Sequence, residues 1–557
     1  MALVLPPAAA PARPLPLPTG WLTLLAIGAA LLIAMPILSV GSNVFRGGTA
    51  GTWSHLAATV LPDYMLTTLW LCIGVGIGAA LLGVGAAWLV THFDFPLRRS
   101  FEWALVLPLA MPAYVMAYAY TDLLQYVGPV QTWLRDTFGW SRADYWFPDV
   151  RSLGGAMLMF AGVLYPYVYM LARTAFLERG TALFEAGRSL GLSPWRSFLR
   201  ISLPMARPAI MVGVALALME TLADYGTVSY FAVQTFTTGI YRAWFSLGDR
   251  VAAAQLSMCL LGIVVLVLAM ERFSRGRARF HVSGLRRAAS HGATLTGWRA
   301  ALAIGGCLVP LMVGFLIPCT VLLHMAINEG DAQFGPRFVE LARNSFTVAA
   351  VTALLAVLLA LLIAYARRLD PKPATRIAHA AAGMGYALPG SVIAVGLLIP
   401  LAQLDNALAQ WLRANVGWNT GLLITGGIGG LVYAYLVRFL TAALQTVDAA
   451  LQRITPHMDD AARSLGLTPA ESLKRVHLPL LRRGLLTAGL LVFIDVMKEL
   501  PATLVMRPFN FDTLATQAYT LASDERLAEA STASLAIVVV GLLPMMILCR
   551  QVARDRH

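Results

Sequence analysis

The chain has 557 residues, of which 58% are hydrophobic and 13% are charged, and its mean hydropathy is +0.69. A soluble domain cannot cover that much apolar surface with polar residues, so the composition excludes an ordinary soluble protein. The formal net charge is +13. In a membrane protein such an excess is expected on the cytoplasmic side before it indicates affinity for nucleic acid.

Apolar segments of roughly 20 residues, long enough to cross a hydrocarbon layer of ~30 Å as helices, recur along the whole chain. They lack the alternating pattern of a lipid-facing barrel strand, so the spanning segments are predicted to be helical. The predicted fold class is an all-α membrane protein with about twelve transmembrane helices. They are expected at residues 21–40, 65–91, 101–121, 154–174, 206–228, 252–270, 301–325, 345–366, 377–401, 421–443, 484–505 and 531–549.

Both ends of the chain are predicted to be cytoplasmic tails, at residues 1–20 and 551–557. The first tail is rich in proline and is expected to be disordered. The first span could instead be the apolar part of a secretory signal, but it is longer than the usual ~7–15 residues, and we expect it to be retained. Arginines gather after the second, fourth, sixth and eighth spans and at the C-terminal end, which predicts that these segments are cytoplasmic.

One stretch of sequence occurs twice. The first copy, Glu185 to Pro204, reads EAGRSLGLSPWRSFLRISLP, and the second, Asp460 to Pro479, reads DAARSLGLTPAESLKRVHLP. Because both copies are basic and should lie on the same membrane face, each half must contain an even number of spans. We therefore predict two parallel six-helix repeats, at 21–271 and 300–550, joined by a cytoplasmic linker at 272–299.

The repeat predicts a helix, a glycine turn and a short second helix. Gly191 and Gly466 suit the left-handed position that ends a helix. Ser193-Pro194 begins the next helix as an N-cap followed by proline, and Thr468 with Glu471 has the spacing of a capping box. The short helices, at about 194–202 and 469–477, are expected to end where a Leu-Pro pair turns the chain back toward the bilayer.

Two other structures share this description. A DNA-binding helix-turn-helix is one, but membrane spans begin within a few residues of Pro204 and Pro479, so neither short helix could easily enter a major groove. An amphipathic connector on the lipid surface is the other. A mere connector, however, does not need the same glycine, proline and acidic positions twice. We expect no nucleic-acid partner.

Both copies resemble the EAA loop of ABC-importer permeases, which docks on the nucleotide-binding subunit in that family. Two copies of the loop imply two copies of a cytoplasmic ATPase. This sequence departs from the family pattern at Gly187, where alanine is usual, and at Asp460, where glutamate is usual. The resemblance implies that coupling to the ATPase depends on Glu185, Ala186, Gly191, Leu203, Pro204, Asp460, Ala461, Gly466, Leu478 and Pro479.

ATP itself is expected to bind elsewhere. No G-x-x-x-x-G-K-[ST] sequence occurs, and the lysines are Lys372, Lys474 and Lys498, none of them preceded by glycine. We therefore expect a transport subunit without catalytic residues or a cofactor of its own, with ATP and magnesium on the partner ATPase. The cysteines occur singly inside or at the ends of apolar segments, which predicts packing residues rather than disulfides or a metal site.

Ionisable residues at membrane depth are candidates for a solute pathway. The fifth and eleventh spans, at equivalent places in the two halves, supply the candidates Glu220, Asp224, Tyr225, Asp495, Lys498 and Glu499. One interpretation is structural, because Asp495 and Lys498 are three residues apart on a helix and can pair. The other is that Glu220, Asp224 and Glu499 form a negative lining at the outer mouth of the pathway, which favours a cationic solute.

Two stretches resemble a narrower family, the ferric-iron permeases: LADYGTVSYFAVQTFTTGIYRAW at 222–244 and DVMKELPATLVMRPFNFDTLATQAY at 495–519. The resemblance implies a bacterial inner-membrane importer with a periplasmic iron-binding protein, two ATPase copies and one fused permease. Carboxylate and phenolate oxygens are compatible with Fe(III), but any metal ligands are left unassigned. Related permeases for polyamines, thiamine or phosphonates are the alternatives, and an ion-coupled secondary transporter is a more distant one.

Overall fold

The computed structural model describes residues 20–44, 50–177, 187, 191–275, 293–329, 334–419 and 421–554. The first half of the chain contains α1 (Gly20–Val44), α2 (Ala50–Thr59), α3 (Leu61–His92), α4 (Arg98–Ala104), η1 (Leu107–Ala110), α5 (Ala113–Leu124), α6 (Pro129–Phe138), α7 (Leu153–Ala175), α9 (Pro194–Ser197), η3 (Phe198–Ser202), α10 (Leu203–Ala223), α11 (Gly226–Tyr230), α12 (Phe236–Tyr241), η4 (Arg242–Ser246) and α13 (Arg250–Arg275).

The second half repeats this order. It contains α14 (Gly297–Leu311), η5 (Met312–Leu316), α15 (Ile317–His324), η6 (Met325–Glu329), α16 (Pro336–Leu369), α17 (Pro373–Ala382), η7 (Gly385–Ala387), α18 (Gly390–Asn415), α19 (Ile428–Gln452), α20 (Pro456–Ser464), α21 (Pro469–Ser472), η8 (Leu473–His477), α22 (Leu478–Met497), α23 (Pro501–Met506), α24 (Leu514–Ser523) and α25 (Leu527–Arg554).

The predicted all-α class is confirmed. In the described part of the chain, β structure is limited to a two-stranded parallel pairing between β1 (Phe93–Asp94) and β2 (Ala293–Thr294). Among the described residues, nine helices are long and apolar enough to cross a membrane, or ten if the bent pair 98–110 and 113–138 counts as one span. The two other predicted spans coincide with α22 and α25, and α22 carries charged residues at Arg482, Arg483 and Asp495.

Each half is built around three packed helices, α3, α7 and α10 in the first and α16, α19 and α22 in the second. Small residues allow this close packing. A Cβ atom on Gly83 of α3 would lie 2.8 Å from the carbonyl oxygen of Tyr165 on α7, and Ala356 and Ala360 of α16 are fully buried. The equivalent trios begin 275 residues apart, at 61 and 336, 153 and 428, and 203 and 478.

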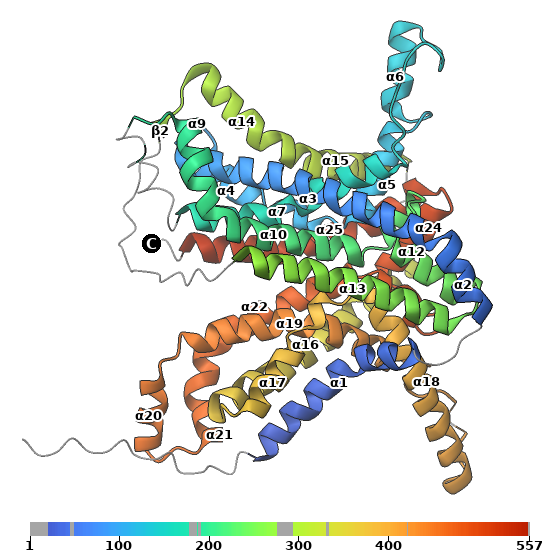
Figure 1. Ribbon diagram of the computed structural model, residues 1–557, viewed down its shortest axis with the longest axis vertical. Coiled ribbons are helices and arrows are strands. Elements are labelled where there is room, and N and C mark those ends of the chain that lie inside the picture. Colours follow the sequence, from blue (N-terminus) through green and yellow to red (C-terminus); the bar gives the residue numbers. More distant parts are fainter. Residues whose placement is uncertain are drawn as a thin grey trace, which may run out of the picture.

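The halves exchange their first helices. Helix α1 packs against α16, α17 and α18 of the second half, whereas α14 packs against α3 and α4 of the first. Figure 1 shows α1 in blue beneath α16 and α17, and α14 lying over the helices of the first half. The predicted boundaries at 21–271 and 300–550 therefore describe repeats in sequence, while each structural unit takes its first helix from the other repeat.

The third span of each half is broken rather than continuous, which differs from the predictions of 101–121 and 377–401. The first break separates α4 and α5 and includes η1, and the second separates α17 and α18 and includes η7. Prolines explain the breaks, because Pro108, Pro112 and Pro389 lie in these segments and lack the N–H that a continuous helix needs. Irregular backbone at membrane depth is tolerated where it lines a cavity.

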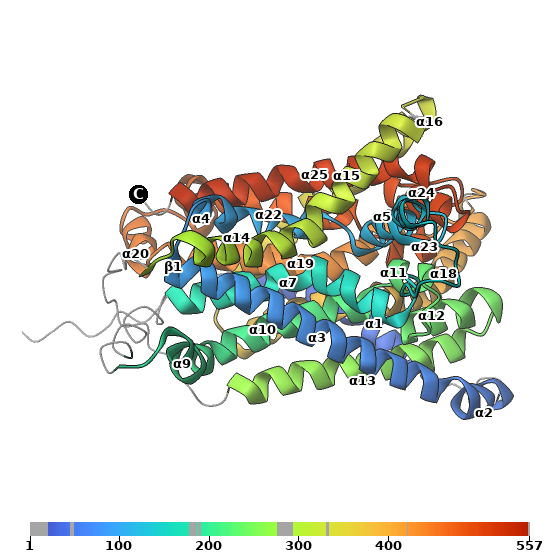
Figure 2. The same cartoon turned by 90° about the horizontal axis from the view of Figure 1, so that it is seen from above.

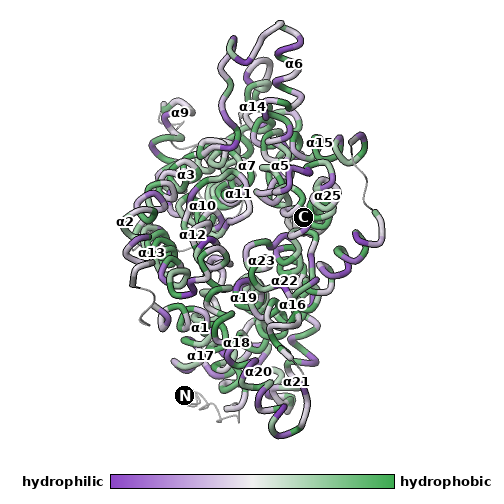
Figure 3. Tube along the Cα trace, turned by 90° about the vertical axis from the view of Figure 1, so that its right-hand side faces the viewer, coloured by the Kyte–Doolittle hydropathy of each residue, from purple (hydrophilic) through white to green (hydrophobic). Residues whose placement is uncertain are grey.

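Figures 1 and 2 show α9 and the α20–α21 pair at the same end of the bundle. The parallel arrangement expected for the two repeated loops is therefore present. Figure 3 shows hydrophobic residues throughout the helices of the bundle and hydrophilic residues on the projecting helix α6.

Candidate functional sites in the duplicated loops and a charged cavity

The turn that ends the first helix of each repeated loop has the predicted left-handed glycine. Gly191 has φ = +83° and Gly466 has φ = +76°. In the second loop the N–H of Leu467 bonds the carbonyl of Ala462 at 3.1 Å, and the N–H of Gly466 bonds that of Arg463 at 2.9 Å. This pair of bonds is a Schellman motif. In the first loop the equivalent bond runs from Leu192 N–H to the carbonyl of Gly187 at 3.0 Å.

Gly187 departs from the family pattern for a steric reason. A Cβ atom at this position would lie 2.7 Å from Cδ1 of Ile201 and 2.9 Å from Oγ of Ser197. The second copy has Ala462 here, and that alanine is buried. A side chain at residue 187 would therefore have to displace Ile201 or Ser197 of the following helical segment.

The predicted capping box of the second loop is confirmed. The N–H of Thr468 donates to Oε2 of Glu471 at 2.9 Å, and the N–H of Glu471 donates to Oγ1 of Thr468 at 3.3 Å. The Thr468 backbone and hydroxyl groups hold the pKa of Glu471 below its usual value, because both donate to the charged carboxylate. In the first loop the N–H of Arg196 approaches Oγ of Ser193 at 3.4 Å, so Ser193 occupies the predicted capping position.

The predicted exit from each loop is wrong in one respect. The Leu-Pro pairs do not end the short helices, because the chain continues through the π turns η3 and η8 directly into α10 and α22. Residues 195–223 form one continuous helix of 29 residues. Pro204 and Pro479 each lie just after a π turn, whose altered hydrogen-bond pattern accommodates a residue without an N–H.

The structure describes the acidic position of the second loop but not that of the first. Glu185 and Ala186 lie outside the described residues. In the second loop Ala461 is exposed, and Asp460 is exposed and pairs with Arg463 of its own helix at 3.3 Å. Leu465, at the tip of the loop, is 80% exposed. An exposed charge pair beside an exposed leucine suits a protein-docking surface.

Between the two halves, most of the residues predicted for the solute pathway come together. Five of the six predicted residues line a cavity of about 100 Å³, which is large enough for water, since a single water needs roughly 10–15 Å³. The carboxylates form two pairs related by the 275-residue repeat, Glu220 with Asp495 and Asp224 with Glu499. The predicted residues in the lining are Glu220, Asp224, Asp495, Lys498 and Glu499.

The cavity also contains Arg438, which the sequence did not single out. Its guanidinium lies 3.2 Å from Oε1 of Glu499 and 3.7 Å from Oε2 of Glu220. Glu220 belongs to the first half, whereas Arg438 and Glu499 belong to the second, so this arginine joins the two halves. The lining that contains Glu220, Asp224 and Glu499 therefore also holds two cations, and its four carboxylates leave an excess of two negative formal charges.

Asp224 and Glu499 each cap a short helix. Oδ1 of Asp224 accepts from the N–H groups of Thr227 and Val228 at 2.9 and 3.3 Å at the start of α11. Glu499 accepts from the N–H groups of Ala502 and Thr503 at 2.9 and 3.0 Å at the start of α23. Helix N-termini favour negative charge, so these carboxylates hold the broken ends of the fifth and eleventh spans beside the cavity.

Comparison with known proteins supports the assignment suggested by the loops. Residues 79–279 match the family model of the binding-protein-dependent transport system inner membrane component. The Fe(3+)-transport system permease protein FbpB 2 of Haemophilus influenzae is 27% identical over 536 residues, which cover 95% of this chain and 98% of that protein. Residues 79–279 therefore carry a permease domain of the binding-protein-dependent (ABC) type, and the similarity to a fused iron permease extends over both halves of the chain.

Other relatives of the permease match a shorter part of it. A probable sulfate transport system permease protein of Chlorokybus atmophyticus is 28% identical over 201 residues, which cover 35% of this chain and 66% of that protein. The molybdenum transport system permease protein ModB of Escherichia coli K12 is 29% identical over 208 residues, which cover 35% of this chain and 87% of that protein.

The remaining predicted residues of the permease have structural partners. Nζ of Lys498 lies 3.0 Å from Oδ1 of Asp495, which confirms the predicted pair. Tyr225 is not part of the cavity lining. Its ring stacks on that of Tyr241, with the ring centroids 3.7 Å apart. The sequence missed Arg438 because an arginine in the tenth span has no counterpart in the first half, where Val163 stands at the equivalent position.

Among the described residues of the permease, no group of three or more His, Cys, Asp or Glu side chains is arranged to hold a metal ion. Cys72, Cys259, Cys307 and Cys319 are free thiols.

Proposed function

We propose that this permease carries ferric iron from a periplasmic binding protein to the cytoplasm. The observation that carries the proposal is the similarity to the Fe(3+)-transport permease of Haemophilus influenzae, because it extends over both repeats. The matches to the sulfate and molybdenum permeases cover about a third of the chain. The cavity is consistent with this choice, since its excess negative charge favours a cation over an oxyanion.

The energy comes from two copies of a separate ABC ATPase, which dock on the duplicated loops. The two loops lie at the same end of the bundle (Figures 1 and 2), so a dimeric partner can contact both. This chain binds no cofactor, and ATP with magnesium belongs to the partner. We place the permease in a bacterial inner membrane, with both loops and both chain termini in the cytoplasm, because the arginine-rich segments favour that side.

Transport proceeds by alternating access between the two structural units. The cavity lies where the broken third span meets the broken ends of the fifth and eleventh spans, and it is lined by both halves. Closing of the ATPase dimer moves the two loops toward each other. Each continuous helix from loop to cavity, α9–η3–α10 in the first half and α21–η8–α22 in the second, carries that movement to the residues of the lining.

Uptake of radiolabelled ferric iron into cells that lack the permease gene tests the substrate. We expect uptake and growth under iron limitation to fall, and a plasmid copy to restore both. Normal iron uptake in the deletion strain would exclude iron as the main substrate. Parallel assays with putrescine, thiamine, a phosphonate, sulfate and molybdate identify the substrate in that case.

A catalytically inactive ATPase tests the energy source. With the partner's catalytic carboxylate replaced, iron uptake should stop while the permease stays in the membrane. Uptake that persists and instead follows an ion gradient would indicate a secondary transporter.

A further inference from the structure

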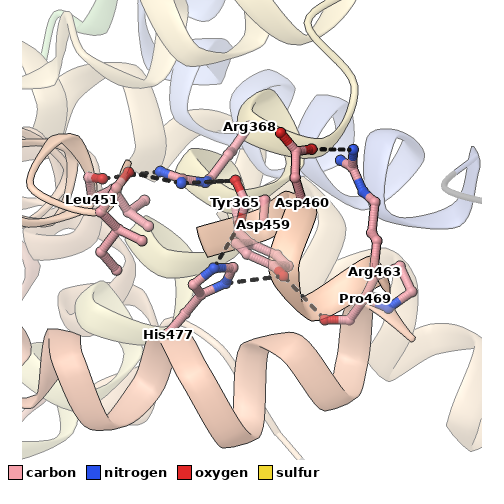
Figure 4. Close-up of polar contacts among 9 residues, drawn as sticks. Tyr365, Arg368, Leu451, Asp459, Asp460, Arg463, Pro469 and His477 are labelled. Atoms are coloured by element: carbon pink, nitrogen blue, oxygen red, sulfur yellow. Dashed lines mark hydrogen bonds and ion pairs between the residues drawn. The ribbon is translucent and has the colours of Figure 1, made fainter. Parts of the chain in front are cut away.

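Helix α20 of the second loop carries two adjacent aspartates that face opposite ways (Figure 4). The side chain of Asp460 is 65% exposed and contacts Arg463 of the same helix. The side chain of Asp459 is 22% exposed and points into the protein. Asp460 aligns with the acidic position of the family loop, whereas Asp459 has no role in that resemblance.

Asp459 holds α20 against the end of α16. Nε and Nη2 of Arg368 donate to its Oδ2 at 3.1 and 2.8 Å. The same guanidinium donates to the carbonyl oxygens of Leu451 and Ile454, each at 2.9 Å, at the end of α19. Arg368 thus fastens the first helix of the loop to two helices of the bundle with four directed hydrogen bonds, and charge-assisted bonds of this kind are the stronger ones.

The other oxygen of Asp459 contacts the start of α22. Nε2 of His477 lies 2.8 Å from Oδ1 of Asp459, and His477 is almost fully buried in the π turn that leads into α22. Its Nδ1 lies 3.3 Å from the hydroxyl of Tyr365, which donates to the carbonyl oxygen of Pro469 at 3.0 Å. One carboxylate therefore connects α20, α16 and the foot of α22, with α21 attached through Tyr365.

The sequence of the first half does not repeat the residues of this network. At the positions 275 residues earlier, Tyr365, Arg368 and His477 are replaced by Val90, Phe93 and Ser202, and Asp459 by Phe184. Aromatic rings occupy this region instead. Trp88 of α3 packs on Phe198 and Trp195 at centroid distances of 4.7 and 5.8 Å. Ring contacts are less directional than ion pairs, so the described short helix of the first loop packs through apolar contacts, whereas the second loop is held by polar contacts of fixed geometry.

We propose that Asp459 is the positioning residue that transmits movement of the second loop into α16 and α22, and that Asp460 instead faces the ATPase. The proposal rests on the function proposed above, in which the loops dock on the ATPase. Because the first half does not repeat Asp459 or its partners in sequence, loss of Asp459 disconnects the second half alone.

Asp459→Asn and Asp460→Asn form a matched pair, since both remove one negative charge from adjacent positions of the same helix. Each variant is reconstituted into liposomes with the ATPase and the binding protein, and ATP hydrolysis, substrate delivered per ATP and ATPase retention on the permease are measured. For Asp459→Asn we expect hydrolysis and retention within about twofold of wild type and delivery per ATP reduced at least about tenfold, because the buried partners lose their ion pair. For Asp460→Asn we expect retention and hydrolysis to fall together, with delivery per ATP unchanged.

The proposal is overturned if Asp459→Asn delivers as much substrate per ATP as wild type. It is also overturned if ATPase retention and ATP hydrolysis fall together in Asp459→Asn. If Asp460→Asn leaves retention and hydrolysis intact, the proposed docking surface is wrong, and that failure is distinct from failure at Asp459. Tyr365→Phe is the control for misfolding, because it removes only one hydroxyl from the network. It should also lower the substrate delivered per ATP, as Asp459→Asn does. The double variant Arg368→Gln/Asp459→Asn should deliver only slightly less substrate per ATP than Asp459→Asn alone, since both substitutions act through one contact.

Discussion

Gly191 and Gly466 are required by backbone conformation rather than by space. A Cβ atom at either position meets no heavy atom within 4 Å, yet both residues have positive φ. For a residue with a side chain, the left-handed conformation costs roughly 1–2 kcal/mol. The glycines therefore set the angle between the two helices of each loop, and any substitution acts through that angle.

We expect Gly466→Ala to reduce uptake several-fold while the protein remains inserted, because about 1–2 kcal/mol of backbone strain favours other loop conformations. Gly305→Ala is the control. Gly305 lies in helix α14, also meets nothing within 4 Å and has no positive φ. Uptake in proteoliposomes and co-purification of the ATPase measure the effect. Equal uptake in the two variants would show that the φ of residue 466 does not matter.

Short helices in this protein depend on their caps, since a helix such as α21 is only 4 residues long. Isolated helices of this length are unstable in water, so the capping box and the continuation into η8 hold α21 in place. The first loop has Ser193 but Arg196 where the second has Glu471. The second loop alone therefore has a titratable cap.

Acidification should loosen α21 and leave α9 unchanged. The pKa of Glu471 is lower in the folded protein than in the unfolded chain, so its stabilisation is complete above the unfolded pKa and is lost as the pH falls through the folded pKa. Hydrogen-exchange protection of residues 469–473 should therefore stay constant from neutral pH to about pH 5 and decrease as the pH falls below about 4.3. Glu471→Gln should remove this pH dependence, because it removes the titratable carboxyl. A similar decrease in residues 194–198 would argue against the capping box as the cause.

The broken third span of the second half also requires a glycine at one place. A Cβ atom on Gly390, the first residue of α18, would lie 2.7 Å from Nη1 of Arg438 and 2.9 Å from Oε1 of Glu499. The ion pair of the cavity is therefore packed directly against the break. A side chain here must push the arginine or the carboxylate away from its partner.

Gly390→Ala should lower the thermal unfolding midpoint of the purified permease, because overpacking costs about 1–3 kcal/mol. Gly489→Ala in α22 serves as the control, since its Cβ would make only an ordinary contact of 3.6 Å with Val357. In that variant the midpoint should be unchanged or slightly higher, because alanine favours a helix by about 0.5–1 kcal/mol. Equal midpoints in the two variants would contradict the packing argument.

At the scale of the whole molecule, the two halves are interlocked as well as repeated. Each contributes its first helix to the other. Arg438 of the second half contacts Glu220 of the first within the cavity, and Arg151 contacts Glu525 at 2.9 Å across the halves. Motion of one half against the other must break or rearrange the buried Arg438 contact, which is screened far less by salt than the exposed one.

We expect Arg438→Gln to raise ATP hydrolysis several-fold in the absence of the binding protein, because the halves lose a buried contact in this conformation. Lys498→Gln removes the same charge from the same cavity but only a contact within one half, so its basal hydrolysis should stay near wild type. ATPase assays of the reconstituted complex compare the two. A similar rise in both variants would assign the effect to cavity charge rather than to the link between halves.

Local signals were sufficient for the loops. The left-handed glycines, the capping box and the repeat offset follow from residue types at short spacing, and the structure confirms them. The Asp495–Lys498 pair was equally readable, because its members are three residues apart on one helix. Apolar length likewise predicted helices at each expected span, although it gave no sign that two of them are broken.

Contacts between distant segments were decided only by the tertiary structure. Arg438 and Glu220 are 218 residues apart on different halves, and Arg368 and Asp459 are 91 apart. Neither pair has a spacing that marks it in the sequence. The sequence also did not predict the helices that α1 packs against. An apolar face indicates that a helix is buried, but it does not identify the neighbouring helix. Sequence therefore determined the repeat, the spans and the loop turns, while packing of the two halves decided which charges meet.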